Sequence, residues 1–308
     1  MKISIFENTG EKFCKEVYLH GINEEVKEIF IELKHPTKIA KQLGVKYTKL
    51  KEWAIRKKPI SLFDLKKLLN LCPEEFKKTV TKKIESKETR LSCKYSPHKI
   101  KISDDISEDL AYIIGIILGD GSVACDNSNS EGNWTIIVFF DNKEHRAIYE
   151  KLVENEFKIK SISGQRKENC FESGFASKII HTFFVKELGM HNGRKAHKIC
   201  FPEKILNGDL TNKAALIQGL FDSDGTITNG YIRYSTVSKI MAEQVQKILF
   251  EIDICTSINV WIKDPKYYPL YTVSVKTTKC KKLFAQKIGF RHPIKKLLLK
   301  RFSDSPLV

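Results

Sequence analysis

The stretch LAYIIGIILGDG, from Leu110 to Gly121, decides the fold because it has a counterpart, KAALIQGLFDSDG, from Lys213 to Gly225. Aligned on the final Asp-Gly, both stretches carry apolar residues at matching places and a glycine five residues before the acid. The two acids, Asp120 and Asp224, are 104 residues apart. Self-similarity of this kind indicates a repeated structural unit.

A second pair of matching segments lies downstream in each half. Lys186 to Met190 (KELGM) matches Gln286 to Phe290 (QKIGF), and each is followed by a basic cluster, at Gly193 to Lys198 and at Arg291 to Lys296. Because two segments match in register, we predict a tandem duplication of a unit of about a hundred residues, a common domain size.

The pattern within each half predicts the element order αββαββα. Trp134 to Phe140 and Gly230 to Thr236 are rich in β-branched and aromatic residues and predict strands. Lys143 to Phe157 and Ser238 to Ile252 have the periodicity of amphipathic helices. The predicted fold class is therefore α+β, with two units related by a pseudo-twofold axis. The predicted organisation is a small all-α domain over residues 1–85, a linker over 86–103, and repeated units over 104–208 and 209–308.

The charge of the chain points to a polyanionic partner. Lys and Arg number 53 against 37 Asp and Glu, a formal net charge of +16. The segment from Lys276 to Arg301 contains ten basic residues and no acidic one. A surplus of this size favours nucleic acid as the partner, although lysine enrichment is also a habit of hyperthermophile proteomes.

Composition also excludes several classes of protein. The eight cysteines contain no C-x-x-C pair, which argues against a zinc ribbon and a thioredoxin-like redox site. The longest apolar run, Leu110 to Leu118, is too short to span a bilayer, and the N-terminus lacks the apolar core of a signal peptide. We expect a monomeric, cytoplasmic, nucleoid-associated protein without a membrane segment.

Small residues at a spacing of four predict close packing of the two motif helices. Gly115 and Gly119 share a face of the first, and Gly219 and Ser223 share a face of the second. If these helices meet at the pseudo-twofold axis, their C-terminal ends bring two carboxylates together. That arrangement is unfavourable without a divalent cation, and oxygen ligands suit Mg²⁺. A single apolar helix ending in Asp-Gly is usually only a capped helix followed by a turn; the repeat and the basic surplus favour the metal site.

These residues resemble a known family. Ile113 to Gly121 and Ile217 to Gly225 are similar to the two signature motifs of LAGLIDADG homing endonucleases of the single-chain, double-motif kind. The first motif, with Leu118-Gly119 before its acid, is a variant of the consensus. Ile232 to Lys239 and Lys287 to Pro293 also resemble segments of this family. The resemblance covers about residues 104 to 303.

The resemblance implies a saddle of two four-stranded sheets over double-stranded DNA, with a long pseudo-symmetric or asymmetric target. It implies that Asp120 and Asp224 bind Mg²⁺, for which Mn²⁺ could substitute, with the carbonyls of Gly119 and Ser223 as further ligands. A lysine near the end of each half helps to position water or neutralise charge. Lys295 matches this lysine in the second half, and Lys195, in preference to Lys198, matches it in the first.

Polar or basic side chains on or beside the predicted strands are candidates for reading DNA. Arg and Gln can make bidentate contacts with base edges, although for any one of them a phosphate contact or a surface charge is favoured over base reading. The candidates are Gln165, Arg166, Arg233, Lys263 and Lys276.

Pro36 to Trp53 predicts a helix-turn-helix. Ala40 stands where two helices pack closely, and Gly44 supplies the turn. Between Lys34 and Lys58 there are nine basic residues and one acid. A DNA contact is favoured over a basic packing module, and the second helix would enter the major groove. The candidate contacts are Lys46, Tyr47, Thr48, Lys49 and Lys51.

The sequence thus predicts a Mg²⁺-dependent, site-specific, double-strand DNA endonuclease of the homing type. Two alternatives remain open: a DNA-binding regulator that kept the fold without nuclease activity, and an intron RNA splicing maturase. Since the chain begins with Met1 and does not end in His-Asn, we do not expect an intein.

Overall fold

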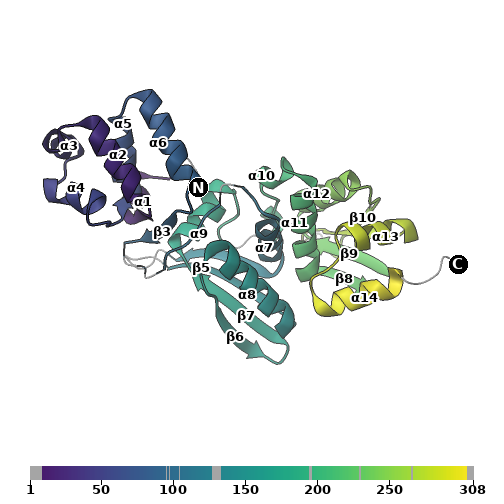
Figure 1. Cartoon of the computed structure of the whole chain (residues 1–308). Coiled ribbons are helices and arrows are strands. Elements are labelled where there is room, and N and C mark those ends of the chain that lie inside the picture. Colours follow the sequence, from purple (N-terminus) through teal and green to yellow (C-terminus); the bar gives the residue numbers. More distant parts are fainter. Residues whose placement is uncertain are drawn as a thin grey trace. The chain divides into compact units, whose positions relative to one another are not determined.

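The computed structural model describes residues 9–94, 96, 98–103, 105–126, 133–193, 196–228, 230–264 and 266–303 (Figure 1). The chain divides into two compact units. The N-terminal unit comprises Met1–Asp104 with Phe157–Ile159, and the core unit comprises Asp105–Glu156 with Lys160–Val308.

The N-terminal unit is mostly helical, as predicted, but it also contains a small sheet that the prediction of an all-α domain did not include. Its three strands are antiparallel in the order β2-β1-β3. The elements are α1 (Glu11–Glu16), β1 (Val17–His20), α2 (Asn23–Leu33), α3 (Pro36–Leu43), α4 (Tyr47–Ala54), β2 (Ile60–Ser61), α5 (Leu62–Asn70), α6 (Glu74–Ser86) and β3 (Arg90–Cys93).

The third strand corrects the prediction of a linker over residues 86–103. β3 pairs with β1 in a register that runs from Val17 opposite Cys93 to His20 opposite Arg90. Leu91 is fully buried and forms a further bridge with Ile100, which is also buried. β3 consists of a few residues without helical periodicity, and its partner strand lies far away in the sequence. Local sequence patterns therefore did not reveal it.

The predicted helix-turn-helix is confirmed as a structural element by α3 and α4. Gly44 ends α3 with a φ of 70°, a left-handed conformation that glycine adopts without strain. The N–H of Val45 then donates to the carbonyl of Ala40 over 3.0 Å, which closes the end of the helix. The buried residues that join the two helices are Ile39, Ala40, Leu43, Leu50 and Trp53.

The core unit repeats the predicted order αββαββα twice. The first repeat contains α7 (Glu108–Asp120), β4 (Gly121–Asp126), β5 (Asn133–Phe140), α8 (Lys143–Phe157), β6 (Ile162–Lys167), β7 (Cys170–Ala176) and α9 (Lys178–Thr182). After the short α10 (Glu203–Leu206), the second contains α11 (Leu210–Ser223), β8 (Gly225–Thr228), β9 (Tyr231–Thr236), α12 (Lys239–Glu251), β10 (Ser257–Trp261), β11 (Leu270–Val275) and α13 (Thr278–Lys287), followed by α14 (Pro293–Ser303). The sheets have the equivalent orders β4-β5-β7-β6 and β8-β9-β11-β10.

Each sheet buries one face and leaves the other open. In β9, Ile232, Tyr234 and Thr236 are buried, whereas Arg233 and Ser235 between them are exposed. This alternation is what one covered face requires. The hydroxyl groups of Ser235 and Thr272, opposite it on β11, lie 2.9 Å apart. We call this side the open face.

The two motif helices α7 and α11 pack backbone against backbone, as the spacing of small residues predicts. A Cβ atom at Gly115 would lie 2.2 Å from the carbonyl oxygen of Leu216, and one at Gly219 would lie 2.2 Å from that of Tyr112. Only glycine fits at either position.

The glycines after the two acids are required by close packing rather than by a left-handed backbone. Gly121 is the C-cap of α7, but its φ is −102° and its backbone is extended, so left-handed freedom is not needed. A Cβ atom there would lie 2.6 Å from the Cα of Ile117, and one at Gly225 would lie 2.4 Å from the carbonyl oxygen of Phe221. These glycines allow the first strand of each repeat to turn back closely along the helix before it.

Candidate functional site

The C-terminal ends of the motif helices meet, which brings the segments of Asp120 and Asp224 together. A Cβ atom at Gly119 would lie 2.0 Å from the Oγ of Ser223 and 3.3 Å from the Oδ2 of Asp224. Asp120 is the last residue of α7, and Asp224 is the C-cap of α11. Both carboxylates therefore lie where two helix dipoles already present negative potential, an arrangement that a divalent cation stabilises.

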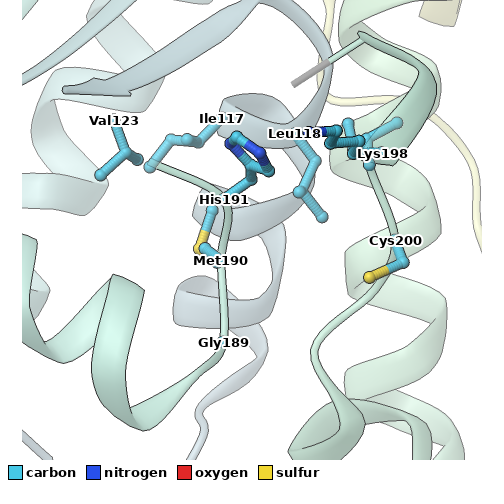
Figure 2. Close-up of a pocket in the computed structure, with 9 residues that line it drawn as sticks. Ile117, Leu118, Val123, Gly189, Met190, His191, Lys198 and Cys200 are labelled. Atoms are coloured by element: carbon cyan, nitrogen blue, oxygen red, sulfur yellow. The ribbon is translucent and has the colours of Figure 1, made fainter. Parts of the chain in front are cut away.

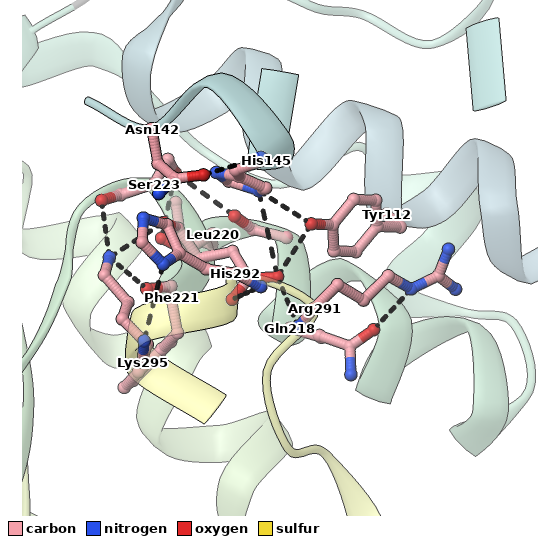
Figure 3. Close-up of polar contacts among 12 residues, drawn as sticks. Tyr112, Asn142, His145, Gln218, Leu220, Phe221, Ser223, Arg291, His292 and Lys295 are labelled. Atoms are coloured by element: carbon pink, nitrogen blue, oxygen red, sulfur yellow. Dashed lines mark hydrogen bonds and ion pairs between the residues drawn. The ribbon is translucent and has the colours of Figure 1, made fainter. Parts of the chain in front are cut away.

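The ammonium group of Lys295 closes the end of α11 (Figure 3). Its Nζ donates to the carbonyl oxygens of Phe221 over 3.0 Å, Asp222 over 2.7 Å and Ser223 over 2.9 Å. Burial lowers the pKa of Lys295, while Asp222, Asp141, Asp120 and Asp224 act in the opposite direction. With its three protons donated in this way, Lys295 is suited to neutralising charge rather than to positioning water. The Ser223 carbonyl, a candidate metal ligand, is already one of its acceptors.

Asp222 is a buried carboxylate that the sequence analysis did not single out. It is 1% exposed, and its Oδ2 accepts from the hydroxyl of Tyr112 over 2.7 Å and from the backbone N–H of Arg291 over 2.9 Å. Its Oδ1 accepts from the backbone N–H of His292 over 3.1 Å. Burial raises the pKa of Asp222, and these hydrogen bonds oppose the rise. The only sequence signal was the difference between the motifs, since the first has Leu118 at this place.

Asp141, His145 and His292 form a second polar cluster beside Asp222. Their possible ligand atoms lie within 4.8 Å of one another. However, the Tyr112 hydroxyl donates to Asp222, so it must accept from His145 Nε2, 2.9 Å away. His292 Nδ1 faces the backbone N–H of Lys295, so its Nε2 donates to Asp141 Oδ1 over 2.9 Å. With both Nε2 atoms carrying protons, this cluster is a hydrogen-bond network rather than a metal centre.

The neutral state of His145 predicts a loss of stability in acid. Burial, followed by the nearby His292 and Lys295, lowers the pKa of His145 to about 3, whereas an unfolded histidine titrates near about 6.5. Protons therefore bind the unfolded chain first, so the stabilisation is complete above about pH 6.5 and is lost as the pH falls toward about 3. Each pH unit in this window costs at most about 1.4 kcal/mol. His145→Gln keeps an N–H donor for Tyr112, and its melting temperature should fall less between pH 6.5 and 4 than that of the wild type. Parallel curves for the two proteins would contradict the assignment.

The corresponding end of the first repeat differs from that of the second. Lys195 lies outside the described residues. Lys198 lines a cavity of about 100 Å³ together with Leu118 and Met190 (Figure 2). The side chain of Leu118, the counterpart of Asp222, therefore lines a cavity and offers no carboxylate there.

The predicted DNA-reading residues of the sheets are not equivalent. Arg233 lies on the open face and is exposed. Arg166 is paired with Glu172 and lies 5.1 Å from the ring of Phe139, so its guanidinium is partly committed. Gln165 lies directly opposite Phe171 in the sheet, and Phe171 is on the face that carries α8. Because directly opposite residues share a face, Gln165 does not lie on the open face. Gln165 is exposed but lies off the open face, and a DNA contact by this residue stays a prediction. Lys263 and Lys276 are exposed just beyond the ends of β10 and β11.

The candidate DNA contacts at α4 also differ in whether their side chains already have partners within the unit. Lys46, Tyr47, Thr48 and Lys51 are exposed. Lys49 instead forms an ion pair over 3.1 Å with Asp64, which is largely buried, and lies 5.1 Å from the ring of Trp53. Lys49 therefore already has partners within its own unit, and its contact with DNA stays a prediction.

Among the residues that the structure describes, we find no helix with the length and apolar character needed to cross a bilayer.

Comparisons with known sequences identify the second repeat. Residues 211–289 match the family described as "LAGLIDADG-like domain". The replication factor C small subunit of Methanocaldococcus jannaschii is 27% identical over 196 residues, which are 63% of this chain and 10% of that protein. The ribonucleoside-diphosphate reductase NrdEB subunit alpha of Bacillus subtilis is 25% identical over 173 residues, which are 49% of this chain and 15% of that protein. The chain thus spans only a small part of the length of these curated relatives.

Comparison with solved structures identifies the fold. The homing endonuclease I-DmoI, in structures of its mesophilic variants, superimposes with a TM-score of 0.50 at 19% identity, covering 64% of this chain and 100% of that chain. I-DmoI in complex with DNA and Ca gives the same values. The core unit therefore has the LAGLIDADG fold with two motifs.

Proposed function

We propose, from the LAGLIDADG fold that this chain shares with a homing endonuclease, that it is a site-specific endonuclease which cuts both strands of double-stranded DNA. The observation that carries the proposal is the meeting of two carboxylate-bearing helix ends at one point. Asp120 and Asp224 come from the two repeats, and the ammonium of Lys295 lies at the same point. A site shared between two repeats suits a duplex, which offers one scissile phosphate on each strand.

Mg²⁺, or Mn²⁺ in its place, is the cofactor that these residues fit. The carboxylates of Asp120 and Asp224 would hold it, with the carbonyls of Gly119 and Ser223 as further oxygen ligands. When bound, the metal supplies Lewis acid activation and an activated water for phosphodiester hydrolysis. The fit rests on the donor set, because adjacent carboxylates at two helix C-termini repel each other without a cation. Lys295 offsets part of this negative charge and holds the end of α11 in place.

The open faces of the sheets are the proposed DNA-binding surface of the core unit. Along β9 the open face carries Arg233 and Ser235, which can donate hydrogen bonds to base edges or phosphates. The net charge of +16 supports binding to a polyanion and predicts strong dependence on salt.

The exposed side of α4 is proposed to contact DNA as well. Lys51→Ala should weaken DNA binding and lower the slope of log affinity against log salt by about 1, because one phosphate contact is removed. Lys49→Ala is the matched control: it breaks the ion pair with Asp64, so it should lower the melting temperature more than the salt slope. Binding measured from low to moderate salt separates the two effects, and equal slopes for wild type and Lys51→Ala would argue against a DNA contact by α4.

The proposed function is tested by selection followed by cleavage. A pool of randomised duplexes is first selected for binding to the full chain in Ca²⁺, and the enriched duplexes are then incubated with the protein in Mg²⁺. We expect a double-strand cut at one position of the enriched sequence, abolished by EDTA. A footprint without nicking in Mg²⁺ or Mn²⁺ would instead indicate a DNA-binding regulator, and preference for a folded RNA would indicate a splicing cofactor.

A further inference from the structure

We infer that Asp222 is a positioning residue that sets Lys295 at the end of α11, and that its replacement by Leu118 in the first repeat makes the two halves of the site cut their DNA strands at different rates. This inference rests on the proposed nuclease function, and it predicts that one DNA strand is cut before the other.

Asp222 forms direct hydrogen bonds with the segment that leads to Lys295. Its carboxylate accepts the backbone N–H groups of Arg291 and His292. The next residue, Pro293, begins α14, and Lys295 lies in the first turn of that helix. Its ammonium then reaches back to the carbonyl of Asp222 itself, 2.7 Å away, and to the carbonyls on either side. The side chain and backbone of one residue thus hold both ends of the segment 291–295.

Asp222 and the segment it binds also contact the first repeat. Tyr112, on α7, donates to Asp222. The Arg291 guanidinium lies 4.4 Å from the centre of the Tyr112 ring and pairs with Asp109 of α7 over 2.9 Å. The position of α14 is therefore coupled to both motif helices, whose ends carry the two candidate metal ligands.

The first repeat has the same sequence frame without the carboxylate. Leu118 stands two residues before Asp120, as Asp222 stands two before Asp224. His191 occupies the place of Arg291, counted from the equivalent glycines Gly189 and Gly289. The side chain of Leu118 has no hydrogen-bond acceptor, and it lines a cavity of about 100 Å³ together with His191. His191 thus lies beside a hydrocarbon side chain, whereas its counterpart Arg291 meets a buried acceptor.

The two strands should therefore be cut unequally. With the strands labelled differently and the full chain in Mg²⁺, we expect one strand to be cut faster. The faster strand should be the one whose cleavage Lys295→Met slows more. Asp222→Asn should slow the same strand roughly 10- to 100-fold, as removal of an orienting partner does, and should affect the other much less. Equal rates in the wild type, or an equal slowing of both strands by Asp222→Asn, would overturn the inference.

A double-mutant comparison separates positioning from general damage to the fold. If Asp222 acts through Lys295, Asp222→Asn should slow cleavage in the wild type but cause little further slowing in Lys295→Met. Retained DNA affinity in Ca²⁺ shows that the variants are folded. Full additivity of the two changes would contradict the inference, because a merely structural role does not depend on Lys295.

A measurement without DNA keeps this inference separate from the nuclease proposal. An amine-reactive reagent followed by mass spectrometry compares labelling of Lys295 with that of the exposed Lys296 in the same molecule. Lys295 should be labelled slowly in the wild type and several-fold faster in Asp222→Asn, while Lys296 stays constant. If the protein cuts no DNA but Lys295 responds in this way, the nuclease proposal fails and the positioning role of Asp222 stands. If labelling of Lys295 does not change, the positioning role fails.

Discussion

Asp224→Asn is expected to reduce the rate of DNA cleavage by at least about 10³-fold, equivalent to about 4 kcal/mol of transition-state stabilisation. The substitution keeps the size of the side chain and removes the negative charge that would hold the metal between the motif helices. Binding to the selected duplex should change far less, because the open faces of the sheets and α4 are untouched. Asp120→Asn should behave in the same way, since it supplies the other carboxylate.

The matched control is Asp209→Asn, which makes the same chemical change at the N-terminal end of the same helix. Asp209 is the N-cap residue of α11, is exposed, and makes no capping hydrogen bond through its side chain. Its replacement should leave strand-resolved cleavage rates close to those of the wild type. Cleavage that survives both Asp120→Asn and Asp224→Asn would falsify the assignment of these residues as metal ligands.

The repeated core unit could be predicted from sequence because its signals are local and occur twice. The glycine spacing in the motif helices, the alternation in β9 and the matched basic clusters each carry structural information within one element. The meeting of Gly119 with Ser223 follows once two such helices share an axis. Prediction of this contact therefore required no knowledge of the loops.

The features that sequence reasoning missed depend on partners far apart in the chain. Asp222 bonds to Tyr112, 110 residues before it, and to Arg291, 69 residues after it. A carboxylate in a helix gives no local sign of such partners. β3 and the Lys49–Asp64 pair were missed for the same reason, since the first needs β1 and the second needs α5.

The close packing of the motif helices makes Gly115→Ala and Gly219→Ala the most destabilising small substitutions that we expect in the core unit. Alanine should favour an isolated helix by about 1 kcal/mol over glycine. Here its methyl group would lie 2.2 Å from a backbone carbonyl of the partner helix, at Leu216 or Tyr112. Backbone cannot move aside as a flexible side chain can, so the helices must separate. We expect a net loss of about 3 kcal/mol or more, which lowers the melting temperature by roughly 6–12 °C for a unit of this size.

Gly164→Ala is the control for these variants, because its Cβ would meet only the Cβ of Glu172, at an ordinary 3.6 Å. It should melt close to the wild type. Separation of α7 and α11 also moves Asp120 away from Asp224, so Gly115→Ala should lose cleavage at temperatures where circular dichroism still shows a folded protein. Gly115→Ala could instead have the same melting temperature as Gly164→Ala and cut at the wild-type rate. In that case the two motif helices do not pack at this distance, and the shared metal site loses its structural basis.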